Sequence, residues 1–533
     1  MGVFNRKKRV RNPRIKKELE GIAKPRPAPE ETVDETFTDR IDENLGKFKK
    51  YLQDSSDIVF REFRMAENNT KCALVYVDGL VDRTVIHEHI MLPLMIGMAY
   101  LRGEDGNQPK TNALESVKQR VVGVAEIKEV QDFDTAMLMM MSGETVLLVD
   151  GSSSVLVLNT RGWKIRGPEE PETETLIRGP REGFTESIRT NTALLRRRCR
   201  DVNMVIKVVR IGRRSKTDVA IVYVKGIVNP ELAGEVVNRL KKVDVDAILE
   251  TGQLEQLIQD SHLSPFPQAQ STERPDKAVS SMLEGRVVIL GDGTPFALIV
   301  PAGFYQFLQS PEDYYERWIA GTLLRLLRLM ASFISIYLPA VYVSLVAFHP
   351  GMLPRDLAIS IAASRERVPF PVFVEAFLME VTIEFLREAG VRLPKPIGQT
   401  IGIVGGIIIG DAAVRAGITS PIMVMVISIT AISTFAIPTY SAALGYRVLR
   451  FAAMLAASVF GLYGVLLFYL ILKIHIANLR SFGINYASPV FPIWFRDLKD
   501  IFIRVPSVYM DRRPEYLYPV DMIRADTGEI RRG

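Results

Sequence analysis

The chain has 533 residues, which is too long for one hydrophobic core and predicts several domains. Its two cysteines argue against a disulfide framework and suit a reducing compartment. The net charge of +6 comes mainly from the two ends of the chain, so it favours contact with an anionic lipid surface and needs no nucleic acid as its explanation.

The first segment, residues 1–55, is highly charged and contains a Lys-Pro-Arg-Pro-Ala-Pro run at 24–29. This composition predicts a basic, partly disordered N-terminal arm. No apolar stretch follows the basic start, so we expect no signal peptide and a cytoplasmic position for the soluble part.

From residue 56 to 320, short β-type runs alternate with amphipathic helical patterns, and two elements occur twice. ALVYVDGLVD (73–82) resembles AIVYVKGIVN (220–229), and GETVLLVDGSSSVLVL (143–158) resembles GRVVILGDGTPFALIV (285–300). The second element predicts a strand, an Asp-Gly turn and a strand, with Gly151 and Gly293 supplying the positive φ of a tight hairpin. We therefore expect two duplicated α/β (α+β) subdomains, 56–190 and 191–320, joined by a linker that includes 168–181 and the basic helix 192–199.

The region 321–475 contains apolar stretches long enough to cross about 30 Å of hydrocarbon. We predict an all-α transmembrane bundle of about four helices, with spans at about 329–348, 397–418, 421–444 and 448–473. A further helix at 371–389 is interfacial, re-entrant or a fifth crossing. Arg325 and Arg328 place the start of the first span in the cytoplasm, and an even number of crossings returns 476–533 there as a basic tail.

The span 397–418 has two different faces on a helical wheel. One face carries the four-spaced glycines expected at close helix contacts, Gly398, Gly402, Gly406 and Gly410. The opposite face carries Thr400, Val404, Ile407 and Asp411. If several copies surround an axis, Val404 and Ile407 would form an apolar constriction and Asp411 an acidic ring that favours cations. The alternative is a packed helix in which Asp411 pairs with Arg415 at i,i+4.

A second acidic feature is the stripe Glu380, Glu384 and Glu388 within 371–389. Glu380 and Glu384 are predicted to line a water-filled vestibule, and a solvated face of an interfacial helix is the alternative. The sequence has no phosphate-binding Gly-x-x-x-x-Gly-Lys-Ser/Thr loop and no His-Glu-x-x-His pair. We therefore predict no catalytic residue, no metal site and no cofactor.

Long strings of the sequence resemble the A subunits of spore germinant receptors, the GerA family. They include EPETETLIRGPREGFTESIRTNTALLRRR (170–198), SPFPQAQSTERPDKAV (264–279), LGDGTPFALIVPAGF (290–304), SPEDYYERW (310–318) and the stretch 347–421. The resemblance implies a multi-pass subunit of the spore inner membrane, with both termini on the core side. It also implies a transporter-like, nutrient-binding B subunit and a lipoprotein C subunit as partners, and a homo-oligomeric, nutrient-gated channel for monovalent cations.

Some features of the chain bear on that resemblance. A related branch of the family acts as an auxiliary channel component, but the long basic arm and complete soluble module favour a receptor A subunit. Asp411 stands where many members carry Gln, and 484–500 is a shortened version of the usual stretch.

Two other functions remain open from the sequence. In one, the soluble module binds the nutrient between its subdomains and the membrane part is an anchor. In the other, the chain is a scaffold for partner subunits. We expect no enzymatic activity.

Overall fold

The structure, a computed structural model, describes residues 36–65, 69–96, 114, 117–118, 126–162, 170–171, 173–392 and 409–525. The chain divides into two compact units. The first contains Ile58–Gly162 with the preceding residues up to Gln53 and with Val520–Ile523; the second contains Trp163–Pro519 with Asp54–Asp57 and the end of the chain from Arg524. The predicted pore segment therefore lies mostly outside the described residues.

The first unit is built on an antiparallel five-stranded sheet with the order β1-β2-β4-β5-β3. Hydrophobic residues of η1 and α4 pack on one face of it, including Ile86, Ile90 and Leu94. The elements are β1 (Ile58–Arg64), β2 (Lys71–Val77), β3 (Ile127–Val130), β4 (Thr145–Val149), β5 (Val155–Leu158), α2 (Ile41–Leu52), α3 (Arg83–Val85), η1 (Ile86–Met91), α4 (Leu92–Ile96) and α6 (Phe133–Met141).

Within the predicted N-terminal arm 1–55, the structure describes residues 36–55 and they contain helix α2. Its residues Ile41, Leu45, Phe48 and Leu52 follow helical spacing and are buried. Phe48 and Phe133 of α6 have ring centroids 4.8 Å apart. The arm therefore ends in a helix that belongs to the first unit.

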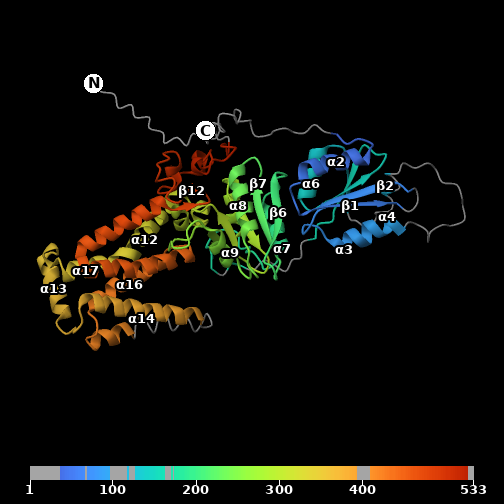
Figure 1. Cartoon of the computed structure of the whole chain (residues 1–533). Helices are drawn as coiled ribbons and strands as arrows, with labels where there is room; N and C mark the ends of the chain where they lie inside the picture. The colour runs from blue at the N-terminus through green and yellow to red at the C-terminus, as the bar shows by residue number, and fades with distance from the viewer. Residues whose placement is uncertain are drawn as a thin grey trace, which may run out of the picture. The chain divides into compact units, whose positions relative to one another are not determined.

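The second unit repeats this design with an antiparallel sheet of order β6-β7-β9-β10-β8. Figure 1 shows its helices on both sides of the sheet, with α7 and α10 packing on one face and α8 and α9 on the other. The elements are β6 (Met204–Ile211), β7 (Thr217–Val224), β8 (Gln270–Thr272), β9 (Val287–Gly291), β10 (Ala297–Val300), α7 (Ile188–Arg198), α8 (Pro230–Lys242), α9 (Thr251–Ile258) and α10 (Pro275–Leu283).

The duplication predicted from the sequence is confirmed by the matching strand order and by details of the turns. The two predicted hairpins form, with φ of +83° at Gly151 and +86° at Gly293. The duplication also extends further than predicted, because α7 is the counterpart of α2 and is no part of a linker. Asn44 Oδ1 accepts from the Thr38 N–H at 3.0 Å, and Asn191 Oδ1 accepts from the Thr185 N–H at 2.8 Å.

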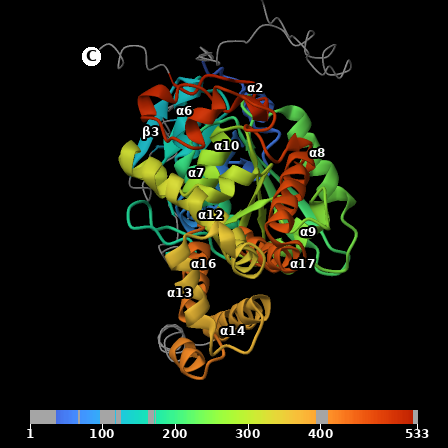
Figure 2. The ribbon, with the colours of Figure 1, turned by 90° about the vertical axis from the view of Figure 1, so that its left-hand side faces the viewer.

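The helical region of the second unit holds two helices long and apolar enough to cross a membrane among the described residues, and not about four. These are α12 (Trp318–Ala347) and α17 (Tyr440–Asn478). The predicted span 421–444 is interrupted, because α16 (Pro421–Phe435) ends before α17 begins. The remaining helices are η3 (Phe304–Leu308), α11 (Glu312–Tyr315), η4 (Pro350–Met352), α13 (Arg355–Arg365) and α14 (Val372–Arg392). Figure 2 shows α14 at the outer end of this region.

Helix α17 folds back on itself at Gly461. Gly461 has φ +60° and ψ −141°, which is a glycine conformation, and Phe348 and His349 occupy the space that a Cβ would need. The ring of Phe266 lies 6.3 Å from Tyr446 and 6.1 Å from His475, whereas a straight helix would separate those two residues by roughly 40 Å. The helix therefore forms two antiparallel arms, 440–460 and 462–478.

The tail after α17 packs against the second sheet's subdomain. It contains β11 (Arg480–Ser481), β12 (Ile484–Asn485), η5 (Asp497–Asp500), η6 (Ser507–Tyr509) and η7 (Glu515–Leu517). Ser481 Oγ accepts from the Ala302 N–H at 3.0 Å and donates to the Gln268 carbonyl at 2.7 Å. The Arg286 guanidinium donates to the Tyr516 hydroxyl at 2.6 Å. The tail is therefore a folded part of the second unit.

Candidate functional site in the helical region

Of the residues predicted for the span 397–418, the structure describes Gly410 and Asp411. Thr400, Val404, Ile407, Gly398, Gly402 and Gly406 lie outside the described residues. Gly410 is buried, and a Cβ there would lie 3.6 Å from a methyl group of Val424 on α16. Asp411 is exposed and pairs with Arg415 at 2.9 Å, which is the ion pair of the alternative interpretation. The pore role of this face stays a prediction.

Glu380 of α14 makes a fully buried ion pair with Arg450 of α17. Both side chains have no exposed surface, and the Arg450 Nη1 to Glu380 Oε2 distance is 2.6 Å. Arg450 also donates to the Ser335 carbonyl of α12 at 2.7 Å and to the Thr434 hydroxyl of α16 at 2.6 Å. One guanidinium therefore joins four helices of the region.

Glu384, one turn further along α14, lies in a second charged contact. Its carboxylate accepts from Arg387 at 2.6 Å and from Arg447 of α17 at 3.1 Å. The two arginines stack on aromatic rings, Arg387 at 5.1 Å from the Phe435 centroid and Arg447 at 5.7 Å from that of Tyr440. In a single chain, Glu380 and Glu384 therefore face arginines of the same chain.

A third carboxylate fixes the first turn of α14. Glu375 is buried and accepts from Arg365 at 3.2 Å. Its other oxygen accepts from the Ser420 N–H at 2.6 Å, the Ser420 hydroxyl at 2.7 Å and the Thr419 hydroxyl at 3.1 Å. This contact ties α14 to the N-terminal end of α16.

The partner arginines of these carboxylates were not predicted from the sequence. Arg447 and Arg450 lie at the start of the predicted span 448–473. Their i,i+3 spacing puts them on one helix face, as the i,i+4 spacing does for Glu380 and Glu384. Glu380 Oε1 is buried without a hydrogen-bond partner among the described residues. Charges buried among apolar helices are costly, so they mark this contact as the candidate functional site.

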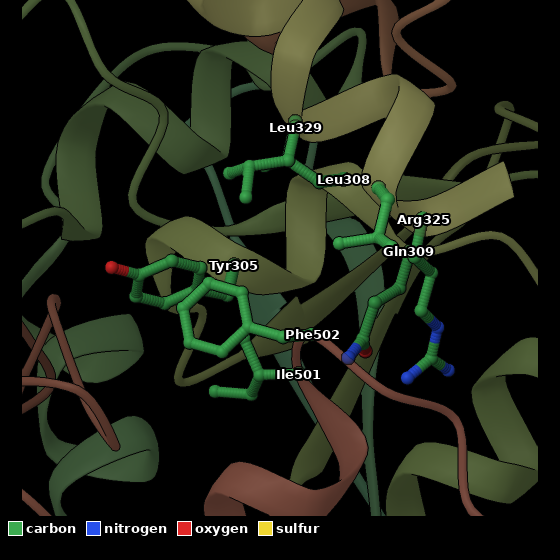
Figure 3. Close-up of a pocket in the computed structure, with 8 residues that line it drawn as sticks. Tyr305, Leu308, Gln309, Arg325, Leu329, Ile501 and Phe502 are labelled. Carbon is green, nitrogen blue, oxygen red and sulfur yellow. The ribbon is translucent and has the colours of Figure 1, made fainter. Parts of the chain in front are cut away.

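Another buried charge cluster joins the start of α12 to the tail. The Asp313 carboxylate has no exposed surface and pairs with Arg325 at 3.1 Å and with Arg328 at 2.7 Å. Arg325 also pairs with Asp500 of the tail at 2.8 Å, and Asp500 accepts from the Tyr314 hydroxyl. Figure 3 shows Arg325 at a cavity of about 10 Å³, beside Leu329 of the same helix and Ile501 and Phe502 of the tail.

The loop 261–268 of the second α/β subdomain enters between the two arms of α17. Ser264 Oγ lies 2.9 Å from His475 Nε2 on the second arm. On the first arm, a Cβ at Gly445 would lie 2.4 Å from the Pro265 carbonyl oxygen, so this position accepts only glycine without movement. This loop therefore connects the α/β subdomain directly to both arms.

A half-buried carboxylate of α9, that of Glu255, lies close to this loop. Burial raises the pKa of Glu255 to about 7, and the Ala269 N–H opposes that rise. The neutral form is therefore substantially populated near neutral pH. Among the described residues, no group of three or more His, Cys, Asp or Glu side chains is arranged to hold a metal ion.

Comparison with known proteins gives several extensive matches. The chain matches the family described as Bacillus/Clostridium GerA spore germination protein over residues 46–516. Spore germination protein B1 of Bacillus subtilis (strain 168) is 44% identical over 489 residues, covering 91% of this chain and 98% of that protein. Spore germination protein GerLA of Bacillus cereus is 43% identical over 485 residues, covering 90% and 97%.

One solved structure is also similar. It is the crystal structure of the N-terminal domain of the A subunit of the Bacillus megaterium spore germinant receptor GerK3. Its sequence is 36% identical, it covers 51% of this chain and 98% of its own, and the TM-score is 0.40.

Proposed function

Because this chain belongs to the GerA family of spore germination proteins, we propose that it is the A subunit of a nutrient germinant receptor. In this proposal several copies assemble in the spore inner membrane and form a channel for monovalent cations. A transporter-like B subunit binds the nutrient, and a lipoprotein C subunit completes the receptor. The N-terminal arm and the tail lie on the spore-core side.

The observation that carries the channel proposal is the buried contact between α14 and α17. A Glu–Arg pair with no exposed surface, placed among apolar helices, is costly and marks a functional region in a membrane protein. In this proposal the helical region has two arrangements, one with α14 docked on α17 as in the structure and one with the Glu380–Arg450 pair separated. A nutrient-bound partner would shift the equilibrium between them.

Within this proposal the residues have separate roles. Val404 and Ile407 form the apolar constriction, and Asp411 provides the acidic mouth. Glu380 and Glu384, predicted as vestibule residues, would face water only when α14 leaves the arginines of α17. The loop 261–268 transmits the state of the soluble part to the two arms of α17.

The proposed gate is tested by Val404→Thr, which keeps the side-chain shape and adds a hydroxyl. A more polar constriction holds water more readily, so spores carrying this variant should release potassium without nutrient. The matched control is Val448→Thr on α17, where the side chain is 65% exposed in the single chain. Potassium release is measured with an ion-selective electrode in spores of a host that lacks its own receptors, and protein level is measured by immunoblot.

One result of the Val404→Thr experiment would contradict the proposed gate. If Val404→Thr reaches the normal level in the membrane and its spores release potassium only with nutrient, as the Val448→Thr control does, residue 404 is not at a gate. If the spores germinate normally and no variant changes the release of potassium, the chain acts as a scaffold.

A further inference from the structure

A polar cavity of about 60 Å³ lies between the tail and the second α/β subdomain. Part of its lining comes from Glu284 and Arg286 before β9, and part from Tyr305, Gln306 and Gln309 around η3. The tail supplies the rest. The basic side chains of the lining are Arg286, Arg496, Lys499, Arg512 and Arg524, and the acidic ones are Glu284, Asp497 and Asp500.

The negative charge of the acidic side chains in the lining is partly compensated, since Glu284 lies 3.4 Å from Arg286. Asp500 already pairs with Arg325. Burial raises the pKa of Glu284 and of Asp497, which favours their neutral forms. The lining has five basic and three acidic side chains, of which Arg496 pairs with Glu515 and Lys499 with Asp511.

The basic side chains of the lining differ in whether they have hydrogen-bond partners within the described part of the chain. The Arg286 guanidinium is buried and donates to the oxygens of Gln306 at 2.8 Å and Tyr516 at 2.6 Å, to the Pro301 carbonyl and to the Glu284 carboxylate at 3.4 Å. Arg512 and Arg524 are exposed, and neither side chain has a hydrogen bond or ion pair within the described part of the chain. Arg512 and Arg524 are therefore available as donors at the cavity.

The cavity lies at the level where α12 enters its apolar stretch. It shares Tyr305, Gln309 and Ile501 with the smaller cavity of Figure 3, which is closed by Leu326 and Leu329 of α12. The backbone of the tail also meets α12 there, because the Arg504 N–H donates to the Thr322 hydroxyl at 3.1 Å. The basic cavity and the first turns of α12 thus lie side by side.

The tail segment beside the cavity exposes large apolar side chains. Phe491, Ile493 and Phe495 are 59%, 59% and 82% exposed, directly before Arg496 of the lining. Aromatic and apolar groups next to arginines are typical of segments that lie in the headgroup region of a bilayer. The basic side chains of the lining and these exposed apolar side chains therefore both favour a lipid as the partner.

We propose that this cavity binds the phosphate of an anionic phospholipid, with Arg512 and Arg524 as the donors and Phe491, Ile493 and Phe495 in contact with the lipid. Guanidinium groups bind phosphate oxygens in a bidentate manner, which suits Arg512 and Arg524 as the donors. The proposal requires that α12 enters a bilayer and does not require channel activity, so the two proposals fail independently.

The test uses the full chain purified in a neutral detergent and titrated in native mass spectrometry. The probes are phosphatidylglycerol, phosphatidylcholine and glycerol 3-phosphate. The wild type should bind phosphatidylglycerol in preference to the other two. The double variant Arg512→Ala/Arg524→Ala should bind it roughly 25-fold more weakly, at about 1 kcal/mol per basic residue. Arg214→Ala, which removes an exposed arginine away from the cavity, should bind as the wild type does.

Three outcomes overturn the proposal. Unchanged phosphatidylglycerol binding in the double variant would show that the cavity is not the site. Equal loss in Arg214→Ala would show an effect of net charge alone. Glycerol 3-phosphate binding as tightly as the lipid would show a site for soluble phosphate esters. Circular dichroism of each variant checks that the fold is intact, which is expected because both arginines are exposed.

Discussion

Replacing Arg450 alone should destabilise the helical region more than replacing both members of its ion pair. Arg450→Met leaves the Glu380 carboxylate fully buried without a cation, and loss of one partner of a buried pair costs about 3–5 kcal/mol. The change also removes hydrogen bonds to the Ser335 carbonyl and the Thr434 hydroxyl, each worth about 1 kcal/mol. We expect the free energy of unfolding to fall by about 5–7 kcal/mol.

The double variant Glu380→Leu/Arg450→Met removes both charges and should cost about 2 kcal/mol or less, because apolar replacements of a buried pair are often neutral. The assay is reversible denaturant unfolding of the purified full chain in detergent, followed by circular dichroism. Glu388→Gln is the control, since Glu388 and Arg392 form an exposed pair on the same helix worth no more than about 0.5 kcal/mol. The free energy of unfolding of the double variant is compared with those of the single variants Glu380→Leu and Arg450→Met. If its loss equals the sum of the two single losses, the pair has no coupling energy and the argument fails.

Two further predictions concern the contact of the α/β subdomain with the helices. Gly445→Ala should lower the free energy of unfolding by about 1–3 kcal/mol, because its Cβ would overlap the Pro265 carbonyl. The control Gly234→Ala on α8 has open space around its Cβ and should stabilise the chain by up to about 1 kcal/mol. Equal effects of the two variants would contradict the contact. Since burial raises the pKa of Glu255 from 4.5 to about 7, the folded chain keeps a proton that the unfolded chain has released. Unfolding free energy should therefore fall as pH rises across that interval, and Glu255→Gln should remove this part of the slope; an unchanged slope would refute it.

The duplicated sheets could be predicted because their signals are local. Asp-Gly turns between alternating strands fix a hairpin within a few residues, and both glycines have the expected positive φ. Helix α2 also had a local signal, with Ile41, Leu45 and Phe48 at helical spacing, but the average charge of 1–55 obscured it.

The contacts in the helical region could not be predicted in the same way. The sequence around Gly461 is apolar and compatible with a continuous helix, and only the packing of both arms against Phe266 decides where the chain reverses. The acidic stripe of α14 was visible, but its environment depends on Arg447 and Arg450, more than 60 residues away in sequence. Charge spacing indicates a helix face and leaves open whether water or an arginine covers it.

The reversal at Gly461 also decides how the chain can change its reach across a bilayer. In the proposed membrane arrangement, the two arms of α17 contribute an even number of crossings, because both lie beside the same loop of the α/β subdomain. Adding or removing a turn in each arm would move the Gly461 tip deeper or shallower without transferring the tail to the other side. In that arrangement, the depth of the hairpin and the side of the membrane on which the tail lies are thus independent properties.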